Sequence, residues 1–351
     1  MKRKIEKLQE ILNVAVDGRK IFGTSFCIRH LDFNWCGSSG NLELNGQFFI
    51  ASTTKLFITS IIMQWRSQGL ISLNDKIEQY LEEDTLKNLH VLGGRDYSRQ
   101  ITIEHLLAHT SGIPDYFQNK DSAGESLEME IVTGKDQHWS YEEAVSRSKR
   151  IQPLFAPGSK GKAHYSDTNF QLLGEIIRKL EGKPLDEVLN QKIIKPLGLA
   201  HTYLYTNPAD IRPAVLYYKN QTLQIPKAMA SFGPDGGIVS TSGDMINFIE
   251  AFFSGGLFPK DYIAEMCKWN KIFFPMQSGI GMHRFKLPWI FNPFGSVPDM
   301  IGHSGLSGAI AYHAPEKNIF IAGTVNQVAF PDRSFRLAIK LMLETIKTIH
   351  R

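Results

Sequence analysis

The chain has 351 residues, of which 42% are hydrophobic and 21% are charged. These are ordinary values for a globular protein, and they exclude intrinsic disorder, collagen and coiled coil. The net charge of +4, from 39 basic and 35 acidic residues, is too small to indicate nucleic-acid binding.

The N-terminal segment predicts an amphipathic helix. Ile5, Leu8, Leu12 and Val16 fall close to helical spacing, and charged residues interrupt any apolar run that would form a signal peptide. No segment reaches the apolar length of a transmembrane helix. We therefore expect a soluble, cytoplasmic protein with neither a membrane nor a nucleic-acid partner. The sequence does not indicate an oligomeric state.

The three cysteines, Cys27, Cys36 and Cys267, are few and odd in number. They indicate neither a disulfide framework nor a zinc motif, and they suit a reducing compartment. Cys27 and Cys36 could face each other across a strand pair, but we interpret them as small buried hydrophobic residues.

Strand-like segments lie toward both ends of the chain, and the middle third consists mostly of helices and loops. Strands are expected at residues 24–30 and 47–50, with a turn at 37–41, and a hairpin at 307–314 and 318–326. Helices are expected at residues 52–68, 102–109, 167–180, from about 241, and at 334–349. This order predicts one α/β sheet domain from residues 1–75 and 225–351, with an inserted helical domain at 76–224. A ligand site is expected at their junction.

The first candidate catalytic residues are Ser52 and Lys55. Lys55 is the single charge in residues 44–65, and a lysine on a buried helix must be paired or neutral. Ser52 lies three residues earlier, so its Oγ could pass a proton to a neutral lysine amine. The alternative is an N-cap serine with a lysine that reaches the surface. The same spacing recurs at Ser146–Lys149 and Ser159–Lys162, so the buried helix, not the spacing, distinguishes Ser52.

Two later segments supply the other groups that such a nucleophile needs. Tyr165 precedes an apolar helix and, as a tyrosinate stabilised by a nearby lysine, is a candidate base and then acid; otherwise it is a packed tyrosine. In the run from Gly302 to Gly305, small residues would let a substrate backbone approach a strand edge. His303 and Ser304 would donate hydrogen bonds to it. The alternative is a glycine-rich turn with a solvated histidine.

Together these segments resemble the serine β-lactamase and penicillin-binding-protein superfamily, within the group of class C β-lactamases, D-amino-acid peptidases and related esterases. That superfamily has Ser-x-x-Lys, Tyr-x-Asn and Lys- or His-x-Gly in this chain order. Further landmarks lie at residues 101–114, 155–158, 196–199 and 236–240, so the resemblance covers about residues 20–345. It implies an α+β fold with an antiparallel sheet flanked by helices and a mostly helical inserted lobe.

The resemblance also implies a serine hydrolase that acts through an acyl-enzyme on an ester or amide, with no cofactor or metal. Ser52 would be the nucleophile, Lys55 its activating partner and Tyr165 the general acid/base. The implied substrate-binding residues are Asp167, His303, Ser304, Gly305 and Leu306. The backbone N–H groups of Ser52 and Leu306 would form the oxyanion hole.

His303 stands where β-lactamases usually have lysine. It therefore favours an esterase, or a peptidase acting on small peptides or D-amino acids, over an efficient β-lactamase, although β-lactams stay among the candidate substrates. The alternative function is a slowly acylating penicillin-binding or sensing module that does not turn over.

Asp167 departs from the family pattern, which has an amide at this position. An amide donates and accepts hydrogen bonds, whereas a carboxylate only accepts. We interpret Asp167 as a cap of the following helix; the alternative is that it pairs with a cation of the substrate.

Two other sequence patterns suggest different chemistry. His105 and His109 are spaced like zinc ligands on one helix face, but the Glu of His-Glu-x-x-His is missing. Neither the Gly-x-Ser-x-Gly of α/β-hydrolases nor a phosphate-binding glycine loop occurs. The apolar segment 287–295, just before His303, forms either a wall for a hydrophobic acyl group or a buried hairpin.

Overall fold

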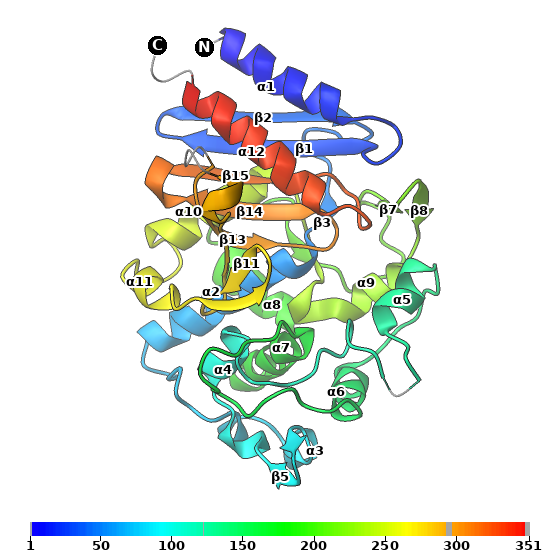
Figure 1. The fold of residues 1–351 in the computed structure, drawn as a ribbon, viewed down its shortest axis with the longest axis vertical. Coiled ribbons are helices and arrows are strands. Elements are labelled where there is room, and N and C mark those ends of the chain that lie inside the picture. Colours follow the sequence, from blue (N-terminus) through cyan, green and yellow to red (C-terminus); the bar gives the residue numbers. More distant parts are fainter. Residues whose placement is uncertain (1, 122, 293–296, 348–351) are drawn as a thin grey trace.

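The computed structural model describes residues 2–121, 123–292 and 297–347 (Figure 1). Within these residues the large sheet has eight antiparallel strands in the order β10-β11-β12-β13-β14-β15-β1-β2. They are β1 (Gly23–His30), β2 (Phe33–Gly40), β10 (Asn270–Phe273), β11 (Met276–Ser278), β12 (His283–Phe285), β13 (Met300–Ser304), β14 (Ala309–Ala314) and β15 (Ile319–Thr324). Segments from both ends of the chain therefore build one sheet, and the predicted fold class is confirmed.

Helices cover both faces of this sheet because its strands are apolar on both sides. They include α1 (Lys2–Ala15) and α12 (Asp332–Lys347) on one face and α2 (Thr54–Ser67) and α10 (Ser242–Ser254) on the other. In β14, Ile310 and Tyr312 belong to the buried cluster under α1 and α12, whereas Ala309 and Ala311 belong to the cluster under α2 and α10. Alternate residues of a strand thus supply two cores. The predicted last helix reached residue 349, which lies outside the described residues.

The segment between residues 76 and 224 is mostly helix and loop. Its elements are η2 (Ile77–Gln79), α3 (Glu83–Leu86), β4 (Val91–Leu92), β5 (Arg95–Asp96), η3 (Ser98–Gln100), α4 (Ile103–Leu107), α5 (Leu127–Val132), α6 (Tyr141–Lys149), α7 (Asp167–Glu181), α8 (Leu185–Leu189), η4 (Asn190–Ile194), β6 (Tyr203–Leu204), β7 (Leu216–Tyr218) and β8 (Gln221–Leu223). Phe170, Leu173 and Ile177 of α7 pack into the same buried cluster as α2. One core therefore joins the helical segment to the sheet; the predicted division into two domains stays a prediction.

A small sheet leads the chain into α2. It has the order β3-β9-β6, with β3 (Phe48–Phe49) and β9 (Ile238–Ser240). After β3 comes η1 (Ala51–Thr53), a turn of 3-10 helix that continues directly into α2. The remaining short elements are α9 (Pro226–Phe232), η5 (Gly233–Asp235), α11 (Tyr262–Met266), η6 (Trp289–Phe291) and η7 (Pro315–Lys317).

The expected turn at residues 37–41 was wrong, because residues 37–40 belong to strand β2. A Cβ added to Gly37 would lie 2.4 Å from the Trp35 ring and 2.7 Å from Gln9 Oε1. Gly37 is therefore a strand residue whose missing side chain makes room for α1, not a turn residue. The expectation was wrong because a strand glycine that accommodates a helix has the same composition as a loop.

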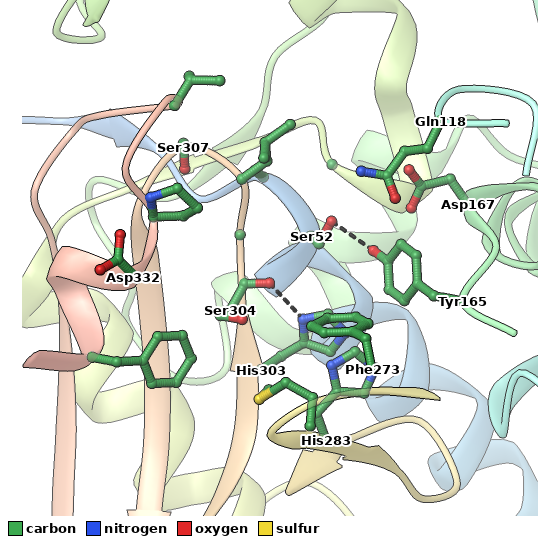
Figure 2. Close-up of a pocket in the computed structure, with 18 of the residues that line it drawn as sticks. Ser52, Gln118, Tyr165, Asp167, Phe273, His283, His303, Ser304, Ser307 and Asp332 are labelled. Atoms are coloured by element: carbon green, nitrogen blue, oxygen red, sulfur yellow. Dashed lines mark hydrogen bonds between the residues drawn. The ribbon is translucent and has the colours of Figure 1, made fainter. Parts of the chain in front are cut away.

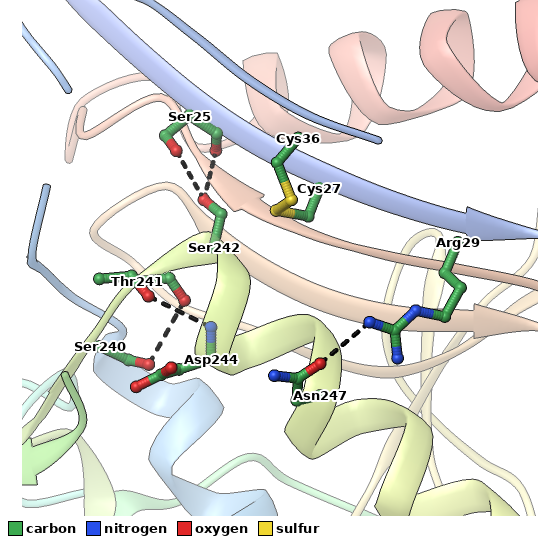
Figure 3. Close-up of a disulfide and its surroundings, with 9 residues drawn as sticks. All are labelled: Ser25, Cys27, Arg29, Cys36, Ser240, Thr241, Ser242, Asp244 and Asn247. Atoms are coloured by element: carbon green, nitrogen blue, oxygen red, sulfur yellow. Dashed lines mark hydrogen bonds between the residues drawn. A yellow bond between two sulfur atoms is a disulfide. The ribbon is translucent and has the colours of Figure 1, made fainter. Parts of the chain in front are cut away.

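Cys27 and Cys36 form a disulfide between β1 and β2 (Figure 3). The strands are connected by a tight turn after His30, and the resulting register pairs Cys27 with Cys36. Our interpretation of these two residues as small hydrophobic side chains was therefore wrong. Cys267 is a free, half-buried thiol. Across the described residues, every helix is too short or too polar to span a membrane.

Candidate active site

Ser52 lies on η1, at the point where the small sheet passes into α2. The preceding residue, Ala51, has φ +45°, a left-handed conformation that a non-glycine residue adopts only when its surroundings hold it there. This turn directs the Ser52 side chain into a cavity. The N-terminus of the helix favours negative charge that develops beside it.

Tyr165 contacts Ser52 directly. Its Oη donates a hydrogen bond to Ser52 Oγ over 2.8 Å (Figure 2). Burial, and next the charge of Asp167, raise the pKa of Tyr165 well above its ordinary value, although the bond to Ser52 lowers it. The resting site therefore holds Tyr165 as a neutral phenol that donates to the serine.

Lys55 is fully buried on the first turn of α2. Its Nζ lies 2.6 Å from Asp167 Oδ1 and donates to the backbone carbonyl of Asp235, also over 2.6 Å. It lies 5.1 Å from the centre of the Tyr165 ring. The structure thus brings the three predicted catalytic residues together, with Tyr165 bonded to the serine and Lys55 paired with a carboxylate.

Two further buried carboxyl groups surround this pair. Asp115 accepts the backbone N–H groups of Phe117, Gln118 and Asp167. Burial and the neighbouring charge of Asp167 raise the pKa of Asp115 to about 8. Asp235 Oδ2 accepts hydrogen bonds from Tyr116 Oη and Gln171 Nε2, each over 2.9 Å. The same two causes raise the pKa of Asp235 well above its ordinary value.

Both shifts favour the protonated form of these two carboxyl groups, which lie beside the ion pair of Lys55 with Asp167.

Three imidazole rings lie behind Tyr165. His109 stacks on Tyr165 with ring centres 4.7 Å apart, and His283 of β12 stacks on His303 of β13 at 4.0 Å. Burial is the main cause that lowers the pKa of all three, to about 3 for His283. They are therefore neutral at physiological pH. His303 Nδ1 donates to the carbonyl of Ser304 over 2.8 Å, so its Nε2 can only accept a hydrogen bond from a substrate.

The segment after β13 packs tightly against the turn that carries Ser52. A Cβ added to Gly305 would lie 2.4 Å from the Ile50 carbonyl oxygen and 2.8 Å from Ala51 Cβ. Ser307 Oγ donates to the carbonyl of Phe49 over 2.7 Å. Gly305 therefore serves a close approach between two backbone segments, where the sequence had suggested an approach by substrate. Leu306 borders the same cavity as Ser52.

The cavity in front of Ser52 has a volume of about 610 Å³ and is mostly apolar. One group of apolar lining residues comes from the helical side: Phe117, Ile131, Leu216, Leu223, Ile225, Met229 and Phe232. Another comes from the sheet side: Phe273, Phe274, Met276, Phe285, Leu287, Phe335 and Ile339. Figure 2 shows Asp167 and Gln118 beside Tyr165, and Asp332 beyond Ser304. The described lining residues include one arginine and no lysine; that residue, Arg336, pairs with Asp332 over 2.9 Å.

Comparison with known proteins decides the family, because the Beta-lactamase family model matches residues 11–343. The chain belongs to the β-lactamase family. It is therefore a serine hydrolase, as predicted.

Among its relatives, an N-acetylmuramyl-L-alanine amidase of Bacillus subtilis is 27% identical over 326 residues, covering 83% of this chain and 70% of the relative. The D-alanyl-D-alanine-carboxypeptidase/endopeptidase AmpH of Escherichia coli is 25% identical over 294 residues, covering 81% and 71%. A D-amino acid amidase of Ochrobactrum anthropi has a similar structure, with a TM-score of 0.80, 22% identity and coverage of 99% of this chain and 100% of that one.

Asp167 distinguishes this β-lactamase-family protein from the family pattern. It is the first residue of α7, Ser166 occupies the N-cap position, and the carboxylate pairs with Lys55. Our favoured interpretation, a helix cap, was therefore wrong. A substrate cation remains a prediction, but it would have to share this carboxylate with Lys55.

Sequence reasoning missed several groups of the site in this family member. Asp115, Asp235 and His283 were not singled out, although Asp115 directly follows the landmark at residues 101–114 and Asp235 directly precedes the one at 236–240. An isolated acid beside a family landmark was the available signal. Nothing in the sequence placed His283 beside His303, because β12 was not predicted.

The structure also bears on the candidate zinc ligands and on the apolar segment 287–295. His105 and Thr102 form a capping box on α4, whereas His109 contacts Tyr165, so the two histidines have different partners. Of segment 287–295, Leu287 lines the cavity, whereas Trp289 and Phe291 are 77% and 65% exposed. At those two residues the segment is neither a cavity wall nor a buried hairpin. Residues 293–295 lie outside the described residues.

Proposed function

We propose that this protein hydrolyses esters or amides of apolar acyl groups through an acyl-Ser52 intermediate, with Tyr165 as the proton carrier. The hydrogen bond from Tyr165 Oη to Ser52 Oγ, at the edge of a large apolar cavity, carries the proposal. A proton carrier must be within hydrogen-bond reach of the nucleophile, and Tyr165 is.

In the proposed reaction, Ser52 Oγ attacks the carbonyl carbon while its proton passes to the Tyr165 phenolate. The carbonyl electron pair moves to oxygen, which accepts hydrogen bonds from the N–H groups of Ser52 and Leu306. Collapse breaks the bond to the leaving group, and Tyr165 returns the proton to that group. Water then repeats the sequence on the acyl-enzyme and releases the acid.

This scheme predicts how activity depends on pH. The phenol that donates to Ser52 must lose its proton before it can act as a base, and Asp167 opposes that loss. Activity should therefore rise as the pH increases toward the alkaline range. Lys55, whose Nζ lies 5.1 Å from the centre of the Tyr165 ring, stabilises the phenolate electrostatically rather than by taking the serine proton itself.

The charges around the cavity favour particular substrates. The described lining offers no unpaired lysine or arginine, and His303 is neutral with an accepting Nε2. A substrate carboxylate, such as that of a β-lactam or a C-terminal residue, would lack a cationic partner. Neutral or cationic esters and amides fit better. The relative named D-amino acid amidase favours an amide.

Intact mass after treatment with a fluorophosphonate tests the nucleophile. We expect one adduct on the wild type and none on Ser52→Ala. Ser146→Ala is the matched control, because this exposed serine belongs to a second Ser-x-x-Lys spacing. An adduct that survives Ser52→Ala contradicts the proposal.

Turnover then separates a hydrolase from a binding module. Nitrophenyl esters from acetate to octanoate, together with phenylalanine amides, should give many product molecules per enzyme, with kcat/KM rising with acyl length. A single stoichiometric burst would favour the slowly acylating module.

The compartment also stays a proposal. The cytoplasm was predicted because the sequence shows no signal-peptide or transmembrane pattern and has few cysteines. The Cys27–Cys36 disulfide opposes that prediction, because such bonds persist mainly in oxidising compartments. Labelling of free thiols in protein isolated under non-reducing conditions distinguishes the two. One reactive thiol per chain indicates an oxidising compartment, and three indicate the cytoplasm.

A further inference from the structure

Five large apolar side chains lie exposed beside the active-site cavity. Phe273 and Phe274 lie at the β10–β11 turn and are 55% and 66% exposed, and Trp289, Ile290 and Phe291 form η6 and are 77%, 72% and 65% exposed. The rings of Phe274 and Phe291 lie 5.8 Å apart, so the two turns form one surface. We call these five residues the aromatic rim. Single exposed apolar residues are common, but a contiguous group of this kind marks an interaction site.

The strands behind the rim carry positive charge. Arg284 and Lys286 share one carboxylate, that of Asp299, and Lys286 Nζ lies 3.2 Å from it. Lys271 of β10 is exposed and takes part in none of the ion pairs found among the described residues. Two positive charges therefore remain uncompensated beside the rim. A second cavity of about 480 Å³ on this side has Lys271 and Lys286 in its lining, together with Phe273 and Pro288.

The rim is continuous with the active-site cavity. Phe273, Phe274 and Pro275 border both cavities, and Leu287, just before η6, lines the one that contains Ser52. Anything that binds the rim therefore lies at the entrance to the catalytic serine. An apolar chain leaving that surface would meet apolar side chains along its way to Ser52.

We propose that the aromatic rim docks the protein on an anionic lipid surface. Trp, Phe and Ile side chains projecting from two turns, with lysines set behind them, match the chemistry of a bilayer interface, where rings enter the headgroup region and lysines meet anionic lipids. The net positive charge of Lys271, Arg284 and Lys286, which only the carboxylate of Asp299 offsets, favours this occupant over an uncharged apolar partner. The docking is peripheral, differs from our expectation of no membrane partner, and is independent of the proposed hydrolase activity.

Co-sedimentation of the full chain with vesicles tests the docking. One set is phosphatidylcholine alone, and the other contains about one third phosphatidylglycerol. We expect binding to the anionic vesicles that weakens as salt rises. The variant Trp289→Ser/Phe291→Ser should bind roughly tenfold more weakly or worse, and Lys271→Gln about fivefold more weakly to anionic vesicles alone. Ile211→Ser is the matched control. Ile211 is a 92% exposed apolar residue that does not belong to the aromatic rim, so its substitution should not affect binding.

Hydrolysis of a soluble acetate ester keeps the two proposals distinguishable. Trp289 and Phe291 do not line the catalytic cavity, so their double variant should keep the wild-type rate while it loses vesicle binding. Absence of wild-type binding to anionic vesicles overturns the docking proposal, and so does an equal loss in Ile211→Ser. If the wild type does not bind vesicles but forms a dimer, and the double variant is a monomer, the rim is assigned to contact with a second copy of this chain instead.

Discussion

Gly305→Ala tests whether the approach of the segment after β13 to the Ser52 turn sets catalytic geometry. The new Cβ would lie 2.4 Å from the Ile50 carbonyl oxygen, whereas ordinary contact begins at 3.4 Å, so the two segments must separate by about 1.0 Å. Ser52 and the Leu306 N–H lie on opposite sides of this contact. A misplacement of about 1 Å in a catalytic group costs roughly 100-fold in rate, so kcat should fall by about that factor.

The assay compares the rates of fluorophosphonate labelling and ester hydrolysis with the thermal midpoint of each variant. Gly243→Ala is the matched control, because its new Cβ would have a single neighbour, Thr241 Oγ1, at 3.8 Å. Being on α10, it should keep full activity and gain up to about 1 kcal/mol of stability. A folded Gly305→Ala enzyme that labels and turns over at wild-type rates would refute the reasoning.

Asp167→Asn removes the charge that raises the pKa of Tyr165, so the acid limb of the pH–rate profile should move to lower pH. Breaking the ion pair should cost roughly 3–5 kcal/mol in urea unfolding; an unchanged profile contradicts the role of Tyr165. Asp115 has a pKa of about 8 when folded against an ordinary 3.8, so it binds its proton more tightly in the native state. Its contribution to stability should be complete below about pH 4 and lost as pH rises through 8, and Asp115→Asn should flatten that dependence in denaturation at pH 5, 7 and 9. The double variant Cys27→Ala/Cys36→Ala should lose about 2–3 kcal/mol, and its melting should not respond to dithiothreitol, unlike that of the wild type.

The long helices and the C-terminal hairpin were predictable from sequence because their apolar periods are clear. Helix α7 was expected at residues 167–180 and spans Asp167–Glu181, and β14 and β15 lie within the expected hairpin. Strand β2 was missed because its Gly and Ser residues have the composition of a turn, although Gly37 is a strand residue that makes room for α1. The disulfide was missed with it, since the pairing of Cys27 with Cys36 depends on the register of that strand.

The catalytic candidates were predictable for a different reason. Ser52, Tyr165 and His303 each stand in a short motif, and the chain order of the motifs identified the family. The tertiary contacts were not predictable, because no local pattern indicates that Asp115 and Asp235, from separate segments, both lie close to Asp167. A motif also does not show which way a side chain turns, and His303 directs its Nδ1–H to a backbone carbonyl instead of to a substrate.

The motifs that identify the family do not determine which side chains of the site carry a proton, and the carboxylate of Asp167 shows why. An amide at this position would leave Lys55 without a counter-charge, and the neighbouring carboxyl groups would be free to provide one. Lys55 is the one lysine or arginine buried among the described residues, and with Asp167 2.6 Å from its Nζ it already has a partner. Burial and the charge of Asp167 then raise the pKa of Asp115 and of Asp235, because a second buried negative charge would lack compensation. In our proposal the serine proton leaves through Tyr165, whose pKa the charge of Asp167 helps to raise, so the pH dependence of activity depends on one oxygen atom that stands in place of an amide nitrogen.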